Sequence, residues 1–176
     1  MPPQCPGLER LTQSRDGAAI AWMTLGRFSR SARKSPGFAA RAIYGYLWVV
    51  AVVFFPVVLL PAYTVMVRDP RRTFYALRDD RGRIQAALCI TTAPGRCWVV
   101  DSHVSRRPGT GQGQRLREQL LPTLLVAADR HGVTIQAHAA TPGLAQVYCA
   151  TVPGLIDAGP ARPFGRRLNR PALPGL

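Results

Sequence analysis

Lysine is almost absent from this sequence of 176 residues, in which Lys34 stands beside 22 arginines. This scarcity argues against lysine chemistry such as Schiff-base catalysis. Acidic side chains are also few, and the nine Asp and Glu residues leave a net charge of +14. Apolar residues make up 47% of the chain, which excludes a strongly charged disordered protein. The length suits one compact domain with additional segments.

Patterns that bind metals or form disulfide frameworks are missing. The four cysteines, Cys5, Cys89, Cys97 and Cys149, form no C-x-x-C pair, and the three histidines do not have zinc-finger spacing. We therefore expect free thiols, a reducing compartment and no metal. The first 20 residues contain no apolar core of signal-peptide length.

One long stretch of the sequence carries no charge. Residues 42–67 read AIYGYLWVVAVVFFPVVLLPAYTVMV. As one straight helix they would extend ~39 Å, which exceeds the ~30 Å of hydrocarbon in a bilayer. Tyrosine and tryptophan near the ends resemble an interfacial aromatic belt. We expect this run to be a transmembrane or bent membrane-inserted helix, with the lipid bilayer as a partner.

The sequence leaves the topology of this apolar run open. Each flank carries five basic residues, so the positive-inside rule gives both flanks the same preference for the cytoplasm. Pro56 lies near the middle and Pro61 follows, so we expect the helix to kink or break near Phe55 and Pro56. The alternatives are a kinked single span, which is the simpler one, and a bent insertion that returns to the same side.

After residue 67 the pattern changes to short strands, turns and helices. The turn sequences around Asp79–Gly82 and Pro94-Gly95 indicate an antiparallel meander. The expected elements are strands at 73–78, 84–92 and 97–104, a helix at 114–131 with a kink at Pro122, a strand at 133–139 and a short helix at 143–151. Upstream, residues 18–28 suit one strand or a short helix. Beyond residue 153 we expect loops and one edge strand at most.

A glycine-rich loop, RRPGTGQG at residues 106–113, connects the third strand to the long helix. A helix N-terminus offers unpaired N–H groups and the positive end of a dipole, and glycines let the backbone approach a phosphate. A P-loop is excluded because no lysine follows the glycines. A Rossmann turn is excluded because the spacing is G-x-G-x-G and the strand at 133–139 ends without an acid.

The order of meander, glycine loop, helix, strand and helix resembles the GNAT superfamily of acetyl-CoA-dependent N-acetyltransferases over residues 73–155. The loop of that family reads R-G-x-G-x-G followed by x-x-L, and residues 108–116 read PGTGQGQRL. Tyr148 stands where the family has a tyrosine on its last helix, whereas Thr141 stands in place of an asparagine. The resemblance implies an α+β fold, a GNAT-like mixed sheet, to which the apolar run adds a membrane helix.

The same resemblance implies roles for individual residues. Acetyl-CoA would be the acyl donor, with its pantetheine arm along the strand that ends at His103 and Val104. Tyr148 would be the acid for the leaving thiolate, and Asp101 or His103, which strand alternation predicts to share one face, would be the base. The implied cofactor-binding residues are Val104, Arg107, Gly109, Thr110, Gly111, Gln112, Gly113 and Thr141.

The sequence therefore divides into a basic segment (1–41), a membrane helix (42–67), a GNAT-like domain (68–160) and an Arg/Pro-rich tail (161–176). We expect a membrane-attached N-acetyltransferase for an unidentified amine, with its C-terminal domain on the cytoplasmic side. The alternative is a non-catalytic membrane-anchored domain that binds acyl-CoA or a partner. Thr141 favours this alternative, as does the absence of the family's Gly-Phe four residues after Tyr148. Nucleic-acid binding is disfavoured because the arginines are spread along the chain and are not interleaved with aromatic residues.

Overall fold

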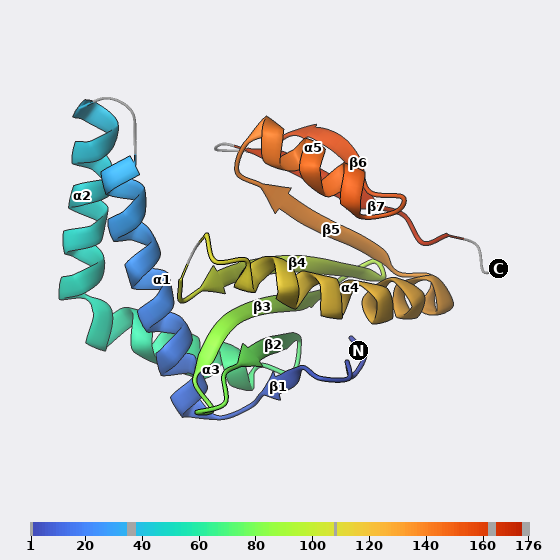
Figure 1. Cartoon of the computed structure of the whole chain (residues 1–176), viewed down its shortest axis with the longest axis horizontal. Coiled ribbons are helices and arrows are strands. Elements are labelled where there is room, and N and C mark those ends of the chain that lie inside the picture. The colour runs from blue at the N-terminus through green and yellow to red at the C-terminus, as the bar shows by residue number, and fades with distance from the viewer. Residues whose placement is uncertain (1, 35–37, 108, 162–164, 174–176) are drawn as a thin grey trace.

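The computed structural model describes residues 2–34, 38–107, 109–161 and 165–173. These residues form a seven-stranded mixed sheet in the order β1-β2-β3-β4-β5-β7-β6, and a helical hairpin stands at one end of it (Figure 1). In chain order the elements are β1 (Glu9–Leu11), α1 (Ser14–Lys34), α2 (Phe38–Val53), η1 (Phe55–Leu59), α3 (Leu60–Arg68), β2 (Arg72–Arg78), β3 (Ile84–Ala93), β4 (Cys97–Ser105), α4 (Gln112–His131), β5 (Thr134–Ala139), α5 (Pro142–Thr151), β6 (Ile156–Pro160) and β7 (Arg166–Arg170).

The middle of the chain folds as the sequence predicts. Strands β2, β3 and β4 pair in antiparallel order and form the expected meander. Helix α4 then crosses to β5, which pairs with β4 in parallel. Gly132, with φ of 61°, ends α4 in the left-handed conformation that glycine adopts at low cost. The predicted boundaries of these elements are within two residues of those observed.

Two apolar layers cover opposite faces of the meander. On one face the leucines of α4 at three- and four-residue spacing, Leu116, Leu120 and Leu124, are fully buried against β2, β3 and β4. On the other face α1 and α3 pack against the sheet through Ile20, Met23 and Val67. The segment at 18–28 thus belongs to one long helix. A third, smaller cluster lies between α5 and the strands β5 and β7.

The C-terminal residues extend the sheet, and the expectation of loops with one edge strand at most is wrong. Strand β7 lies between β5 and β6, so residues of the predicted tail form an interior strand. The sequence of β7 is RRLNR, in which Leu168 is the single apolar residue. The buried position of Arg170 is stabilised by Asp129, whose carboxylate accepts two hydrogen bonds from the guanidinium at 2.8 and 2.7 Å.

The apolar run 42–67 breaks where its prolines predict a break. Helix α2 ends at Val53, a short π-helical segment η1 begins at Phe55, and α3 follows from Leu60. Within the described parts of the chain, no helix combines the length and the apolar character that crossing a bilayer requires. The single membrane helix expected at 42–67 is therefore not supported.

The two strands on either side of the helices α1 to α3 pair with each other. Strand β1 precedes the run and β2 follows it, and the two strands pair in antiparallel order with Glu9 opposite Ala76. Because β1 and β2 are hydrogen-bonded in one sheet, this arrangement disfavours a kinked single span, which would place the residues before and after the run on opposite sides of a membrane. Helix α1 leads away from the sheet, and α2, η1 and α3 lead back to it (Figure 1). We call these helices the hairpin; its chain reversal lies between α1 and α2 and not at the break near Pro56.

Candidate functional site

The pairing between β4 and β5 ends partway along both strands, and we call the stretch between their unpaired ends the slot. The two parallel strands are paired only from Cys97 to Val100 on β4 and from Thr134 to Ala137 on β5. Beyond Val100 strand β4 continues to Ser105, while β5 continues to Ala139 in pairing with β7. The unpaired ends diverge, so the strand edge of β4 that follows Val100 is available to a ligand.

A β-bulge in β4 lies along this slot. Asp101 stands opposite Cys89 and Val104 opposite Ala87, so two residues of β4 face the single residue Leu88. Cys89 and Val104 belong to the cluster under α1, which places Asp101 on the α1 face. The prediction that Asp101 and His103 share one face is therefore wrong, because the extra residue of the bulge reverses the alternation between them.

His103 lies under the first turn of α4. A Cβ atom on Gly113 would stand 2.5 Å from Cε1 and 2.6 Å from Nε2 of His103, so only glycine leaves room for the imidazole. His103 is half-buried on the α4 face, whereas Asp101 is exposed on the other. The side chain of Val104 is buried in the α1 cluster, so only its backbone faces the slot.

The glycine-rich loop leads from the end of β4 into α4. Gly109 and Gly111 have φ of 87° and 76°, and a Cβ on either would meet no atom within 4 Å. The hydroxyl of Thr110 donates to the carbonyl of Arg107 at 2.7 Å, which holds the turn. Among the described residues, no side chain caps the start of α4. The first N–H groups of the helix therefore face open space over small residues, a cradle that fits a phosphate group.

Tyr148 and Thr141 lie on α5, across the slot from α4. The Tyr148 ring is half-buried and lies 5.3 Å from the guanidinium carbon of Arg117, a cation–π contact between α5 and α4. Thr141 is the N-cap of α5, and its hydroxyl accepts a hydrogen bond from the Leu144 N–H at 3.2 Å. The sequence reasoning did not anticipate Arg117, because its partner becomes a neighbour only when α4 and α5 pack.

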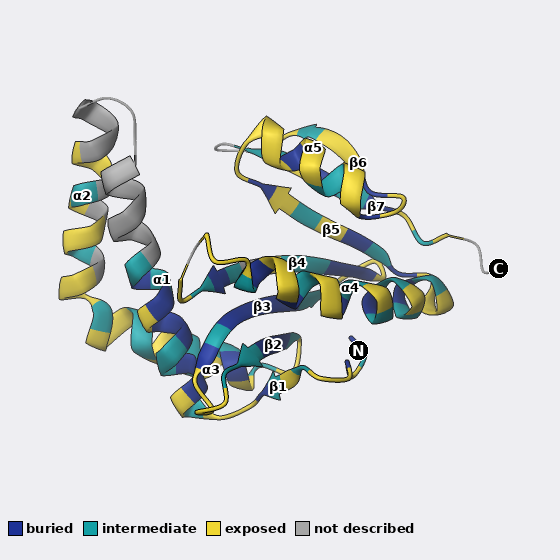
Figure 2. Ribbon diagram, in the orientation of Figure 1, coloured by how far each residue is buried: buried dark blue, intermediate teal, exposed yellow. Residues whose placement is uncertain are grey.

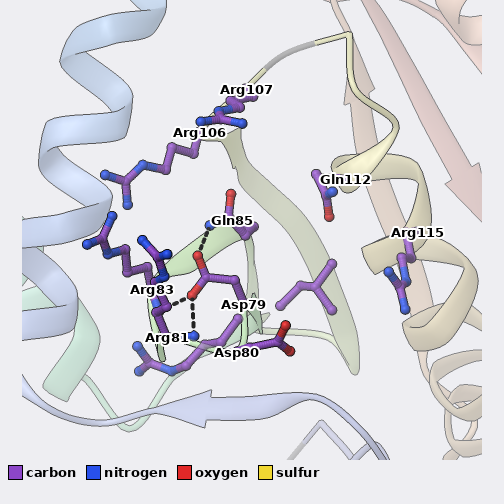
Figure 3. Close-up of a pocket in the computed structure, with 11 residues that line it drawn as sticks. Asp79, Asp80, Arg81, Arg83, Gln85, Arg106, Arg107, Gln112 and Arg115 are labelled. Carbon is purple, nitrogen blue, oxygen red and sulfur yellow. Dashed lines mark hydrogen bonds between the residues drawn. The ribbon is translucent and has the colours of Figure 1, made fainter.

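A hollow of about 530 Å³ opens on the other side of the α4 N-terminus (Figure 3). It lies between the β2–β3 turn, the end of β4 and the first turn of α4. Arg107 and Gln112, which were expected at the cofactor site, line this hollow together with Arg115. Arg117, two residues further along α4, points to the opposite flank of the helix and covers Tyr148. The two flanks of α4 thus present different sites.

Comparisons with known proteins bear on the fold. No family model matches the sequence, and no curated protein matches it either. Solved structures do match: an acetyltransferase of the GNAT family from Staphylococcus aureus Mu50 is 8% identical, with a TM-score of 0.58 over 94% of this chain and 99% of that one. Aminoglycoside 6′-acetyltransferase type Ii is 12% identical, with a TM-score of 0.58 over 96% and 99% of the two chains.

A third structure, described as histone acetyltransferase HPA2 and related acetyltransferase, comes from Corynebacterium glutamicum. It is 16% identical, with a TM-score of 0.57 over 98% of this chain and 100% of that one. At these identities the matches establish the fold. The chain has the fold of the GNAT acetyltransferases, as the motif in the glycine loop predicts.

Proposed function

We propose that this protein is an N-acetyltransferase that uses acetyl-CoA to acylate an amine. The observation that carries the proposal is the slot between β4 and β5, which runs from the bulge in β4 to the glycine loop and the uncapped start of α4. An unpaired strand edge that leads to an anion-binding loop suits a long thioester with a pyrophosphate. The fold, which is that of known acetyltransferases, supports the same conclusion.

The loop residues fit the pyrophosphate of acetyl-CoA. Backbone N–H groups from Gly109 to Gly113 would hold it, because glycine at Gly109 and Gly111 removes the side chains that would keep a phosphate away. The exposed edge of β4 would hold the pantetheine arm. Bound there, acetyl-CoA supplies an activated acetyl group as its thioester.

Three residues are candidates for proton transfer, and they lie in separate parts of the site. Tyr148 on α5 is the candidate acid, because its half-buried ring lies between α5 and α4 at the side of the slot. His103 and Asp101 are alternative bases and not a pair, since the bulge places them on opposite faces of β4. If the amine enters on the α1 face, Asp101 is the better placed base. If it enters on the α4 face, His103 is.

The experiment that tests the proposal is calorimetric titration of the full chain with acetyl-CoA. Gly111→Ala adds one methyl group where the phosphate would lie and should weaken binding about tenfold, equivalent to ~1.4 kcal/mol. Gly95→Ala is the matched control, because Gly95 also has a positive φ of 75° and open space, but lies in the β3–β4 turn. Equal affinities in the two variants, or no binding in the unmodified protein, would overturn the assignment.

A non-catalytic acyl-CoA-binding domain is the second candidate. Two contacts favour it: the hydroxyl of Thr141 is occupied as an N-cap, and the ring of Tyr148 packs under Arg117. Both residues thus have structural roles that need no reaction. This candidate and the enzyme share the acetyl-CoA site and differ in turnover.

We also propose that the helical hairpin attaches the protein to a membrane, with the sheet on the cytoplasmic side where acetyl-CoA is present. Many large apolar side chains of α2, η1 and α3 are exposed (Figure 2). They are Ile43, Tyr46, Trp48, Val49, Val52, Val53, Phe54, Val57, Val58 and Val65. An exposed apolar surface of this extent is typical of membrane or protein contact. Because the hairpin returns to the sheet, it would contact the membrane from one side without crossing it.

A further inference from the structure

Six arginines from three separate parts of the chain line the hollow beside the start of α4. Arg78, Arg81 and Arg83 come from the β2–β3 turn and its flanks, Arg106 and Arg107 from the end of β4, and Arg115 from the first turns of α4 (Figure 3). A volume of about 530 Å³ is within the range of small-molecule sites. All of them except Arg78 are exposed, and together they surround one hollow from three parts of the chain.

The carboxylates in the hollow do not balance these arginines. Arg78 is the exception, because it pairs with Glu9 and with Asp16, the latter at 2.8 Å. The other five make no ion pair with any described residue. Two carboxylates, Asp79 and Asp80, line the hollow with them. The hollow therefore holds an excess of positive charge.

Asp79 already has partners of its own. Its carboxylate accepts hydrogen bonds from the backbone N–H groups of Arg81 and Arg83, at 3.0 and 2.8 Å, and from the Gln85 amide at 2.7 Å. These hydrogen bonds, of which the one from the Arg83 backbone has the largest effect, hold the pKa of Asp79 below its ordinary value. The Asp79 carboxylate therefore stays charged and stays bound within the turn. Asp79 thus fixes the positions of two arginines and has little capacity left to pair with their guanidinium groups.

The backbone keeps the arginines close together despite their repulsion. The Arg106 N–H donates to the Gln85 carbonyl at 2.8 Å, which ties the end of β4 to the start of β3. Arg115 adds a cation near the N-terminus of α4, where no acidic residue lies in the first turn. A cation there opposes the helix dipole, and an anion would relieve both that opposition and the repulsion among the arginines.

The hollow adjoins the acetyl-CoA site proposed above, because Arg107 and Gln112 line it, but it opens on the other flank of α4. Gly109, Gly111, Gly113 and Tyr148 do not line it, and Arg115 and Arg117 mark the two opposite flanks of α4. Guanidinium groups bind phosphate with paired N–H donors, and five of them exceed what one phosphate requires. We propose that this arginine hollow is a second site, which binds a ligand with two or more phosphate groups, either free in solution or on a lipid headgroup.

The test is titration of the full chain with inorganic tripolyphosphate at constant ionic strength. The double variant Arg83→Gln, Arg106→Gln should bind it at least about tenfold more weakly than the unmodified chain. The matched control is Arg96→Gln, Arg130→Gln, which removes the same charge from two exposed arginines outside the hollow. We expect the control to change the affinity less than about twofold. An equal loss in both double variants would assign the binding to diffuse charge and overturn the proposal.

Two further arms separate the sites and the sources of phosphate. The Gly111→Ala variant should bind tripolyphosphate as tightly as the unmodified chain. If Gly111→Ala loses binding while the double variant Arg83→Gln, Arg106→Gln keeps it, the phosphate binds the glycine loop and the proposal is wrong. Vesicles of phosphatidylcholine with and without phosphatidylinositol bisphosphate identify the source. If the chain binds vesicles only when they contain the phosphoinositide, and only with Arg83 and Arg106 in place, the ligand is a lipid headgroup. If the chain binds tripolyphosphate but not these vesicles, the ligand is free in solution. No saturable binding in either arm would refute the site.

Discussion

The hydroxyl of Tyr148 is the candidate acid, a role that a non-catalytic binding domain does not need. Tyr148→Phe keeps the ring and its contact with Arg117 and removes only the proton that the acid would donate. If Tyr148 is the acid, turnover should fall by roughly 10²–10⁴ while the acetyl-CoA affinity stays unchanged. Steady-state rates and titration measure the two quantities, with the exposed Tyr46→Phe as the control.

Two outcomes would contradict this role for Tyr148. Full turnover in Tyr148→Phe would show that the ring is only a packing element. Tight acetyl-CoA binding without turnover on any amine offered would favour the non-catalytic domain. Either result leaves the fold and the acetyl-CoA site untouched.

The pair of Arg170 and Asp129 joins the C-terminal strand to α4. Arg170 is 2% exposed, and the Asp129 carboxylate accepts two bonds from it and a third from the Leu173 N–H at 2.9 Å. The bonds from Arg170 lower the pKa of Asp129 below its ordinary value. Asp129→Asn leaves the buried guanidinium without its charged partner and should cost about 3 kcal/mol at neutral pH.

The cost of Asp129→Asn should depend on pH in one direction. Because the pKa of Asp129 is lower in the folded protein than in the unfolded chain, its stabilisation is fully present above the unfolded value near 4 and is lost as the pH falls through the folded value. Urea unfolding at pH 7 and at successively lower pH should show the two proteins converging below about pH 4. The control is Asp80→Asn, an exposed residue, whose effect should stay within about 0.5 kcal/mol.

At the scale of elements, Gly17 sets how closely α1 approaches α3. A Cβ at this position would lie 2.8 Å from the Tyr63 carbonyl oxygen and 2.9 Å from the Thr64 Cα. Since backbone atoms do not move aside as a flexible side chain does, Gly17→Ala should separate the helices and cost about 1–3 kcal/mol. Gly45→Ala on α2, where nothing lies within 4 Å, should gain up to about 1 kcal/mol through helix propensity. Denaturant unfolding of both variants tests this, and equal effects would contradict it.

The elements differ in how far the sequence predicts them. Strands β2 to β5 and helix α4 were predictable, because their buried residues recur at strand or helix spacing and glycines mark their ends. Strand β7 was not, because Arg170 is buried by a partner 41 residues away, a pairing that no local pattern contains. The site residues differ in the same way. The glycine loop was predictable because it is a local motif, whereas the bulge at Asp101 was not, because it arises from the pairing of β4 with β3.

At the scale of the whole molecule, the proposed attachment of the hairpin to a membrane can be tested. The intact chain should sediment with membranes and resist carbonate at high pH, because its apolar side chains would be in the acyl region. In a Cys149→Ser background, where the remaining native cysteines are buried, Ser14→Cys and Asp80→Cys should both be protected from an impermeant reagent added outside intact cells. Unequal labelling would contradict the pairing of β1 with β2, and full release by carbonate would refute membrane insertion.

The pairing of β1 with β2 also has a consequence for synthesis. Strand β1 leaves the ribosome well before β2, and at 5–20 residues per second the roughly 60 residues between them take about 3–12 seconds. During that interval α1 has no sheet to cover, and the whole apolar run emerges before its anchoring strand exists. The hairpin is therefore exposed as a nascent segment before the sheet at its base is completed.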